Sequence, residues 1–152
     1  MPDIFISHST NDREVAKEIQ DYFFKNGASA FLAPFSIEVG TKWSNEILSN
    51  LKQARVVLFL ASKVACDSPY VNQELGASLM LSKKIVPVIW DMPPENLPGW
   101  VKDYQAVDLR NGFYALRPVL DSIIKKLKLD KNREGILLML AIGFLAWLLL
   151  KE

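Results

Sequence analysis

Short apolar runs alternate with amphipathic segments along about the first 130 residues of the chain. Runs such as RVVLFLA and IVPVIW hold almost no polar residue, which is typical of strands buried on both faces of a parallel sheet. Between these runs, apolar residues recur three and four positions apart, which predicts amphipathic helices. The predicted strands are residues 3–7, 28–32, 55–61, 85–90 and 106–109, and the predicted helices are residues 12–25, 43–53, 69–81 and 114–129.

Strands that alternate with helices of this length imply β-α-β units and one parallel sheet. The sequence therefore predicts an α/β fold, namely a flavodoxin-like three-layer sandwich with a five-stranded parallel sheet, followed by one C-terminal hydrophobic helix. The predicted organisation is a globular domain at residues 1–129, a basic juxtamembrane linker at 130–134 and a transmembrane helix at 135–150.

The C-terminal run GILLMLAIGFLAWLLL carries no charged or hydroxyl side chain over sixteen residues, from Gly135 to Leu150. As a helix it would be about 24 Å long, somewhat short of a hydrocarbon core of about 30 Å. Snorkelling of Lys151 and local thinning of the bilayer would make up the difference. Basic residues cluster just before the run, and this asymmetry predicts a cytoplasmic position for the domain. They are Lys125, Lys126, Lys128, Lys131 and Arg133.

We therefore expect a membrane protein with a single-pass tail anchor and its globular domain in the cytoplasm. The alternative is a buried oligomerisation helix in a soluble assembly. That alternative is weaker because a helix of a soluble protein normally keeps one polar face, and this run has none.

Composition and the first residues of the chain limit the classes of partner and the compartment that we expect for this protein. The formal net charge of +1 argues against binding to nucleic acid, which normally requires a basic surface. Cys66 is the only cysteine, so an intrachain disulfide is impossible and a reducing compartment is expected. The sequence MPDIFISHS has no basic segment followed by a long apolar one, and it does not resemble a secretory signal.

Residues that could support chemistry are few. His8 is the only histidine, which argues against a serine-histidine-aspartate triad and a multi-histidine metal site, so a carboxylate is the expected catalytic group. Ligands of open parallel sheets bind beyond the carboxyl ends of the strands. There the sequence places residues 7–10, 33–41 and 62–68. Tyr70 and Glu74 lie four residues apart and hence on one face of the predicted helix.

Four segments resemble the boxes of the Toll/interleukin-1 receptor (TIR) domain family. DIFISHS at residues 3–9 is similar to the first box, and FLAPFSIEVG at 31–40, with Trp43 and Ile47 after it, is similar to the second box and its BB loop. SPYVNQEL at 68–75 resembles the helix that carries the family's W-x-x-x-E pattern, and IVPVI at 85–89 resembles the fourth strand. The resemblance runs from about residue 3 to residue 127. Ala33 departs from it, because many members carry an aspartate there.

The resemblance implies an NAD⁺-cleaving enzyme of the prokaryotic type. It places the catalytic glutamate on Glu74 and puts Tyr70 in the tryptophan position. It implies no metal and no cofactor, with NAD⁺ entering as the substrate. The residues implied to contact that substrate follow the first strand, lie in or beside the BB loop, or precede the glutamate. They are Ser7, His8, Ser9, Thr10, Phe35, Glu38, Trp43 and Tyr70.

The implied reaction is chemically reasonable for a single carboxylate. Nicotinamide leaves NAD⁺ as a neutral ring, so the enzyme must chiefly stabilise the cationic ribose, as in glycoside hydrolysis. We expect an NAD⁺ glycohydrolase or cyclase that acts as a bacterial immune or stress effector. Self-assembly through TIR–TIR contacts at a membrane would activate it, and a separate sensor protein would trigger that assembly. The alternative is a non-catalytic, membrane-anchored TIR adaptor. A tail that itself perturbs the membrane ranks last.

Overall fold

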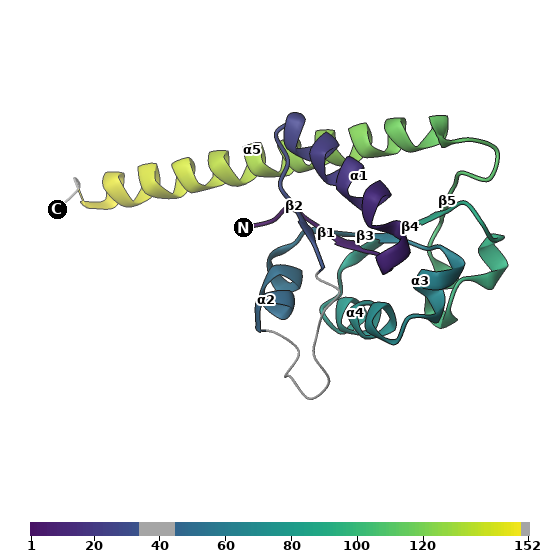
Figure 1. Cartoon of the computed structure of the whole chain (residues 1–152). Helices are drawn as coiled ribbons and strands as arrows, with labels where there is room; N and C mark the ends of the chain where they lie inside the picture. Colours follow the sequence, from purple (N-terminus) through teal and green to yellow (C-terminus); the bar gives the residue numbers. More distant parts are fainter. Residues whose placement is uncertain (34–44, 150–152) are drawn as a thin grey trace.

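Five parallel strands form one sheet at the centre of the computed structural model, which describes residues 1–33 and 45–149 and gives side chains as far as Ile142 (Figure 1). The strand order is β2-β1-β3-β4-β5, the flavodoxin-like order. Every neighbouring pair is parallel, which confirms the predicted α/β fold and sheet. The strands are β1 (Ile4–Ser7), β2 (Ala30–Leu32), β3 (Val56–Leu60), β4 (Lys84–Ile89) and β5 (Val107–Asp108).

Helices cover both faces of this sheet, as the apolar strands predict. Figure 1 shows α1 and α5 above the sheet and α2, α3 and α4 below it. The α-helices are α1 (Arg13–Lys25), α2 (Asn45–Gln53), α3 (Lys63–Asp67), α4 (Pro69–Met80) and α5 (Leu116–Leu149). Short 3₁₀ turns connect them at η1 (Thr10–Asp12), η2 (Pro94–Asn96), η3 (Gly99–Asp103) and η4 (Phe113–Ala115).

The core divides into two layers because successive strand residues point to opposite faces. Phe5, Val57 and Phe59 pack against α2, α3 and α4, whereas Leu58 and Leu60 pack against α1 and α5. All five of these strand side chains are fully buried. Both layers are continuous from strand to helix, so the sheet is a rigid platform for the loops that follow its strands.

The observed elements differ from the predicted ones in three places. No helix was predicted between residues 61 and 69, but residues 63–67 form α3, which Ser62 caps by accepting a hydrogen bond from the backbone N–H of Ala65 (3.1 Å). The proline-rich stretch 91–98 contains η2. The apolar periodicity of the predicted helix 69–81 continues from Val71 and Leu75 to Leu79, yet the side chain of Leu79 is exposed.

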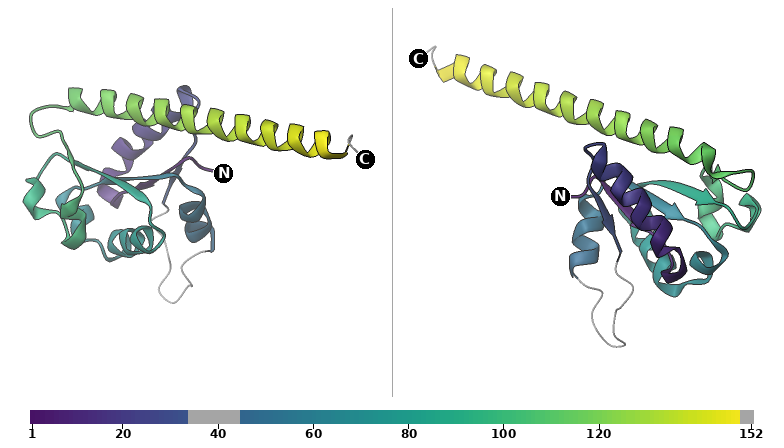
Figure 2. Two further views of the ribbon diagram at one scale, coloured as in Figure 1. Left: turned by 180° about the vertical axis from the view of Figure 1, so that it is seen from behind. Right: turned by 45° about the horizontal axis from the view of Figure 1, so that its top comes forward.

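The largest difference concerns the C-terminal helix. The expected helix 114–129 from Leu116 on, the expected linker 130–134 and the apolar run as far as Leu149 form one continuous helix, α5, that extends past the edge of the sheet (Figure 2). Among the residues that the structure describes, no helix combines the length and the apolar character that a bilayer crossing requires. The predicted transmembrane helix and membrane localisation are therefore wrong. The physical reason is the one that made them borderline: the apolar run is short, and charged residues precede it directly in the same helix.

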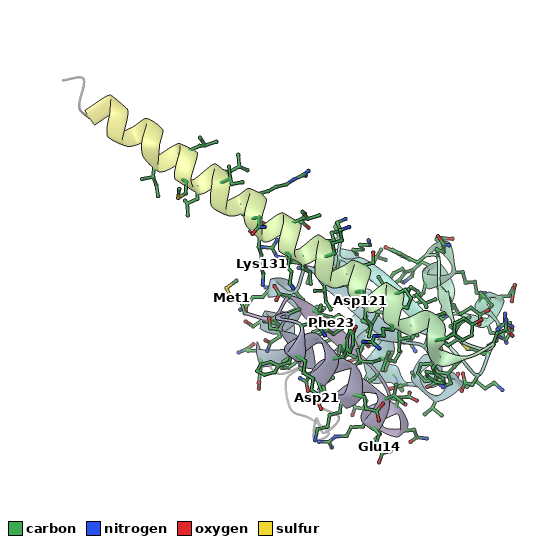
Figure 3. All side chains as sticks on the ribbon, turned by 90° about the horizontal axis from the view of Figure 1, so that it is seen from above. Met1, Glu14, Asp21, Phe23, Asp121 and Lys131 are labelled. Atoms are coloured by element: carbon green, nitrogen blue, oxygen red, sulfur yellow. The ribbon has the colours of Figure 1, made fainter. Side chains whose placement is uncertain are left out.

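Two ion pairs fasten the middle of α5 to the start of the sheet. Lys131 pairs with the buried carboxylate of Asp3 at 2.8 Å, and Arg55 binds Glu134 through two hydrogen bonds of 2.9 and 2.6 Å. Burial raises the pKa of Asp3, but hydrogen bonds from Lys131 and Ser29 outweigh it and hold that pKa below its usual value. Figure 3 shows Lys131 on α5 close to the N-terminal end of the chain at Met1.

Candidate functional site

A cavity of about 140 Å³ opens at the carboxyl edge of the sheet. Its walls come from the residues that follow β1 and β2 and from α3 and α4, the edge at which parallel sheets usually bind ligands. At this edge the structure brings together the predicted residues that follow β1 and those of α4. The lining residues are His8, Ser9, Thr10, Ala33, Val64, Ser68, Tyr70, Val71 and Glu74.

Glu74 is the only carboxylate among the described residues that line this cavity, and its side chain is 5% exposed. It lies in the second turn of α4, a helix that begins at Pro69 with Ser68 as its cap. Ser7, the last residue of β1, donates its hydroxyl proton to Glu74 Oε2 at 2.6 Å. Burial raises the pKa of Glu74 to about 7, against a smaller opposing effect of the Ser7 hydrogen bond. The carboxyl group can therefore take or lose a proton near neutral pH.

His8 lies beside Glu74 in the cavity wall but is held in a neutral form. Its Nδ1 donates to the carbonyl oxygen of Ile6 at 3.2 Å, and a carbonyl only accepts, so the proton sits on Nδ1. Burial lowers the pKa of His8 to about 4. A neutral imidazole with this proton assignment supports a structural role at the end of β1.

Sequence reasoning missed Asp12, the buried carboxylate behind the cavity. Asp12 directly precedes α1, but its side chain makes no capping hydrogen bond. Asp12 Oδ2 accepts instead from the hydroxyls of Ser9 and Ser62, both at 2.5 Å. Asp12 thus connects the loop after β1 with the start of α3. Its second partner lies 50 residues away, so no local pattern could have identified the contact.

Two of the remaining predicted residues are exposed at the edge of the cavity, and the other three lie outside the described residues. Tyr70 and Thr10 are exposed at the mouth of the cavity. Phe35, Glu38 and Trp43 lie outside the described residues, so their predicted contacts stay predictions. Cys66 lies in α3, and burial raises the pKa of its thiol to about 12, which keeps it protonated and unreactive.

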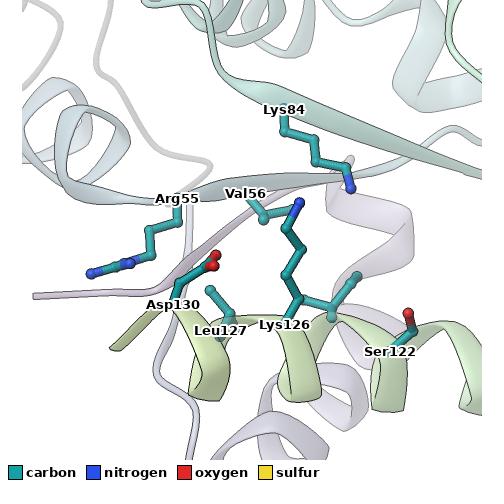
Figure 4. A pocket seen from close by; sticks show the side chains of 8 residues that line it. Arg55, Val56, Lys84, Ser122, Lys126, Leu127 and Asp130 are labelled. Atoms are coloured by element: carbon teal, nitrogen blue, oxygen red, sulfur yellow. The ribbon is translucent and has the colours of Figure 1, made fainter. Parts of the chain in front are cut away.

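A second cavity, of about 200 Å³, lies at the opposite edge of the sheet beneath α5 (Figure 4). Arg55, Lys84 and Lys126 line it, with Asp130 as the carboxylate nearby. This is the edge where the strands begin, and the cavity contains none of the predicted site residues. The cavity around Glu74 is therefore the better candidate for the functional site.

This site has the groups needed to stabilise a cation. The Glu74 carboxylate lies in a poorly solvated place, where its field acts more strongly than in water. The hydroxyl groups of Ser9, Thr10 and Tyr70 beside it can bind the polar parts of a ligand. The site suits a small, polar ligand on which positive charge develops during reaction.

Comparison with known proteins agrees with this picture. The family model described as "TIR domain" matches residues 4–120. The chain is 31% identical over 122 residues to a probable 2′ cyclic ADP-D-ribose synthase, BdTIR, from Brachypodium distachyon. That match covers 76% of this chain and 54% of the plant protein, so the chain spans about half the length of this relative.

Solved structures share the fold at low sequence identity. The TIR domains of the activated Roq1 resistosome align with a TM-score of 0.66 at 16% identity, over 83% of this chain and 99% of that one. The TIR domain of the Toll-related receptor TRR-2 from Hydra magnipapillata aligns with a TM-score of 0.64 at 16% identity, over 83% and 97%. The family model alone covers most of the chain, and the strand order and helix layers agree with it: this chain belongs to the TIR domain family.

Proposed function

We propose that this protein cleaves the bond between nicotinamide and ribose in NAD⁺, with Glu74 as the catalytic residue. The observation that carries the proposal is the position of that carboxyl group. It is 5% exposed, lines a cavity at the carboxyl edge of the sheet and accepts a hydrogen bond from Ser7. A surface glutamate of an amphipathic helix would instead point into solvent.

The chemistry follows from that position. When the C–N glycosidic bond breaks, both bonding electrons leave with nicotinamide, which becomes a neutral ring and needs no acid. The ribose is left with positive charge on C1 and the ring oxygen, and the Glu74 carboxylate stabilises this charge. The electron pair of a water oxygen then forms the new bond to C1 and the water loses a proton to solvent, which gives ADP-ribose. Attack by a hydroxyl group of the same molecule gives a cyclic product instead.

Ser7 and the residues after β1 hold the reacting parts. The Ser7 hydroxyl fixes one oxygen of Glu74, which leaves the other available to the ribose. Thr10 and Tyr70 line the same cavity and can bind the sugar and phosphate groups, whereas Ser9, whose proton goes to Asp12, can accept a hydrogen bond from a sugar hydroxyl. The resemblance to a probable cyclic ADP-ribose synthase at 31% identity supports NAD⁺ as the substrate.

The size of the cavity supports activation by self-assembly. Pockets for ligands of drug size usually measure about 300–1,000 Å³, whereas the described walls here enclose about 140 Å³. NAD⁺ needs further walls, which the predicted contacts of Phe35, Glu38 and Trp43 and TIR–TIR contacts between copies would provide. We therefore propose that activity rises with protein concentration and that the enzyme acts as an immune or stress effector in response to a separate sensor protein.

The test is turnover of NAD⁺ by the purified full chain at several protein concentrations, followed by chromatography of the products. Replacement of Glu74 by Gln keeps the size of the side chain and removes the charge, and it should lower turnover roughly a hundredfold to a thousandfold. Glu14→Gln is the matched control, because Glu14 is an exposed helix residue, and it should retain full activity.

Equal turnover in the Glu74→Gln and wild-type proteins would contradict the proposal. Absence of NAD⁺ cleavage at every concentration, with the fold intact by circular dichroism, would also contradict it and would favour the adaptor function.

A further inference from the structure

The last part of α5 is an unusual surface for a globular protein. Residues 135–149 extend beyond the sheet as a helical rod, and all three ribbon views show it projecting from the domain (Figures 1 and 2). We call this segment the apolar extension. Its side chains are described as far as Ile142, and the sequence stays apolar up to Leu150.

The described side chains of the apolar extension are exposed on every side of the helix. Six of them, at positions 136–140 and 142, have between 59% and 76% of their surface exposed. Successive residues of a helix turn by about 100°, so these six positions surround the axis. Figure 3 shows side chains standing out on both sides of the rod. A surface helix of a globular protein normally keeps one polar face, and this segment has none.

The base of the rod is fixed. Lys131 pairs with the buried Asp3, and Arg55 holds Glu134 through two hydrogen bonds just before the extension begins. These contacts join α5 to the sheet at the point where the helix leaves the domain. The apolar extension is thus presented in one direction and does not fold back onto the domain's own core.

The exposed area is close to what a stable protein interface needs. Each of the six side chains offers roughly 100 Å² of apolar surface, so together they offer roughly 600 Å². A standard interface buries roughly 800 Å² on each partner, and the largest apolar patch of a typical monomer is roughly 300–600 Å². The described part of the apolar extension alone therefore approaches the area that a standard interface buries on one partner.

From these observations we propose that the apolar extension is a self-association surface, which packs against the same segment of other copies of this chain in a helical bundle. Copies of one chain supply helices with the same apolar sequence, so each apolar side of one extension can pack against an equally apolar side of another. A single neighbour covers only one side of each rod, so burial on all sides requires more than two copies. This contact is separate from the TIR–TIR contacts proposed above, and it does not depend on the proposed catalysis.

The test is the oligomeric state of the full chain in detergent-free buffer, by analytical ultracentrifugation between about 1 and 100 µM. The wild type should form a defined oligomer larger than a dimer. Leu137→Lys combined with Leu140→Lys should weaken assembly at least a hundredfold, because it places charge inside the bundle. Leu129→Lys is the control: Leu129 is an exposed apolar residue of the same helix before the extension begins, and the variant should assemble like the wild type.

A second measurement detects the contact directly. A cysteine introduced as Ile142→Cys in a Cys66→Ala background should form disulfide-linked dimers on mild oxidation, whereas Tyr114→Cys in the same background should not. Both positions are exposed, so neither variant loses packing.

Three outcomes would overturn the proposal. The wild type could stay monomeric over the whole range, or the double lysine variant could assemble as well as the wild type. In the third, the chain would float with phosphatidylcholine vesicles and show no cross-link through Ile142→Cys, which would make a lipid surface the occupant.

Discussion

The Glu74 carboxyl group passes from water into the protein interior when the chain folds, and burial raises its pKa from about 4.5 to about 7. The folded state therefore binds the proton more tightly than the unfolded state. Stability from this group is fully present below about pH 4.5 and is lost as the pH rises through 7, because the folded protein must then hold a buried negative charge.

This linkage predicts the effect of a neutral side chain on stability. Glu74→Gln should be more stable than the wild type at pH 8, by on the order of 1–3 kcal/mol, and the difference should largely vanish near pH 4.5. Urea unfolding of both proteins at the two pH values measures it. A variant that is less stable than the wild type at pH 8 would show that the carboxyl group is well accommodated as an anion.

The hydrogen bond from Ser7 opposes the effect of burial. The Ser7 hydroxyl donates to the Glu74 carboxylate and lowers the pKa of Glu74. Ser7→Ala should therefore move the acid limb of kcat/KM for NAD⁺ to higher pH. At pH 7 we expect a roughly five- to tenfold loss, which corresponds to a hydrogen bond worth about 1–1.5 kcal/mol. The pH profile is the diagnostic, because a purely structural defect would lower activity without moving the limb.

Helical spacing and family resemblance predicted Glu74 and Tyr70 as site residues, but the sequence could not give the environment of their side chains. Ser7 and Glu74 are 67 residues apart, and only the packing of α4 against β1 brings them together. The raised pKa depends on burial, which no local pattern encodes. Phe35, Glu38 and Trp43 remain predictions, as they lie outside the described residues.

At the scale of elements, Asp12 connects three segments. It accepts hydrogen bonds from Ser9, which lines the cavity, and from Ser62, which caps α3. Because one carboxylate binds both serines, it fixes the distance between the segment after β1 and the start of α3 at the carboxyl edge of the sheet. The geometry of the cavity therefore depends on a residue that does not line it.

Loss of this connection should affect both stability and binding. Asp12→Ala leaves two buried hydroxyl groups without their acceptor and should cost roughly 1–3 kcal/mol of unfolding free energy. It should also raise KM for NAD⁺ because Ser9 is no longer held in the cavity wall. The exposed Asp21, labelled in Figure 3, gives the control, and Asp21→Ala should change stability by no more than about 0.5 kcal/mol. Unchanged stability in Asp12→Ala would mean that the two serines find other partners.

The elements themselves were largely predictable, since burial on both faces imposes apolar strands and the helices follow a clear period. The strands start or end within about two residues of their predicted bounds. Helix α3 was missed because its five residues are too few to show a helical period. Leu79 is exposed because the buried face of α4 runs from Val71 and Leu75 to Ser78, which is fully buried, and the apolar spacing alone did not show that a serine takes the core position.

Considered as a whole molecule, the chain is a TIR domain whose last helix, α5, extends beyond the domain. Composition located the apolar run correctly, but its interpretation as a membrane anchor was wrong. The sequence of the run gives only its hydropathy. The structure shows that the run is the end of a helix whose middle is joined to the sheet by ion pairs with Asp3 and Arg55. If several copies assemble through this helix, their domains come close together, which would favour TIR–TIR contacts through a higher effective concentration.

The central claim is that one buried carboxylate, on Glu74, stabilises the cationic ribose. The most direct test is the pH dependence of kcat/KM for NAD⁺, measured together with an NMR titration of the Glu74 carboxyl carbon in the free protein. We expect kcat/KM to rise with pH, to level off above about 7, and to follow the titration of Glu74. An activity that is independent of pH between 5 and 9 while Glu74 titrates within that range would contradict it.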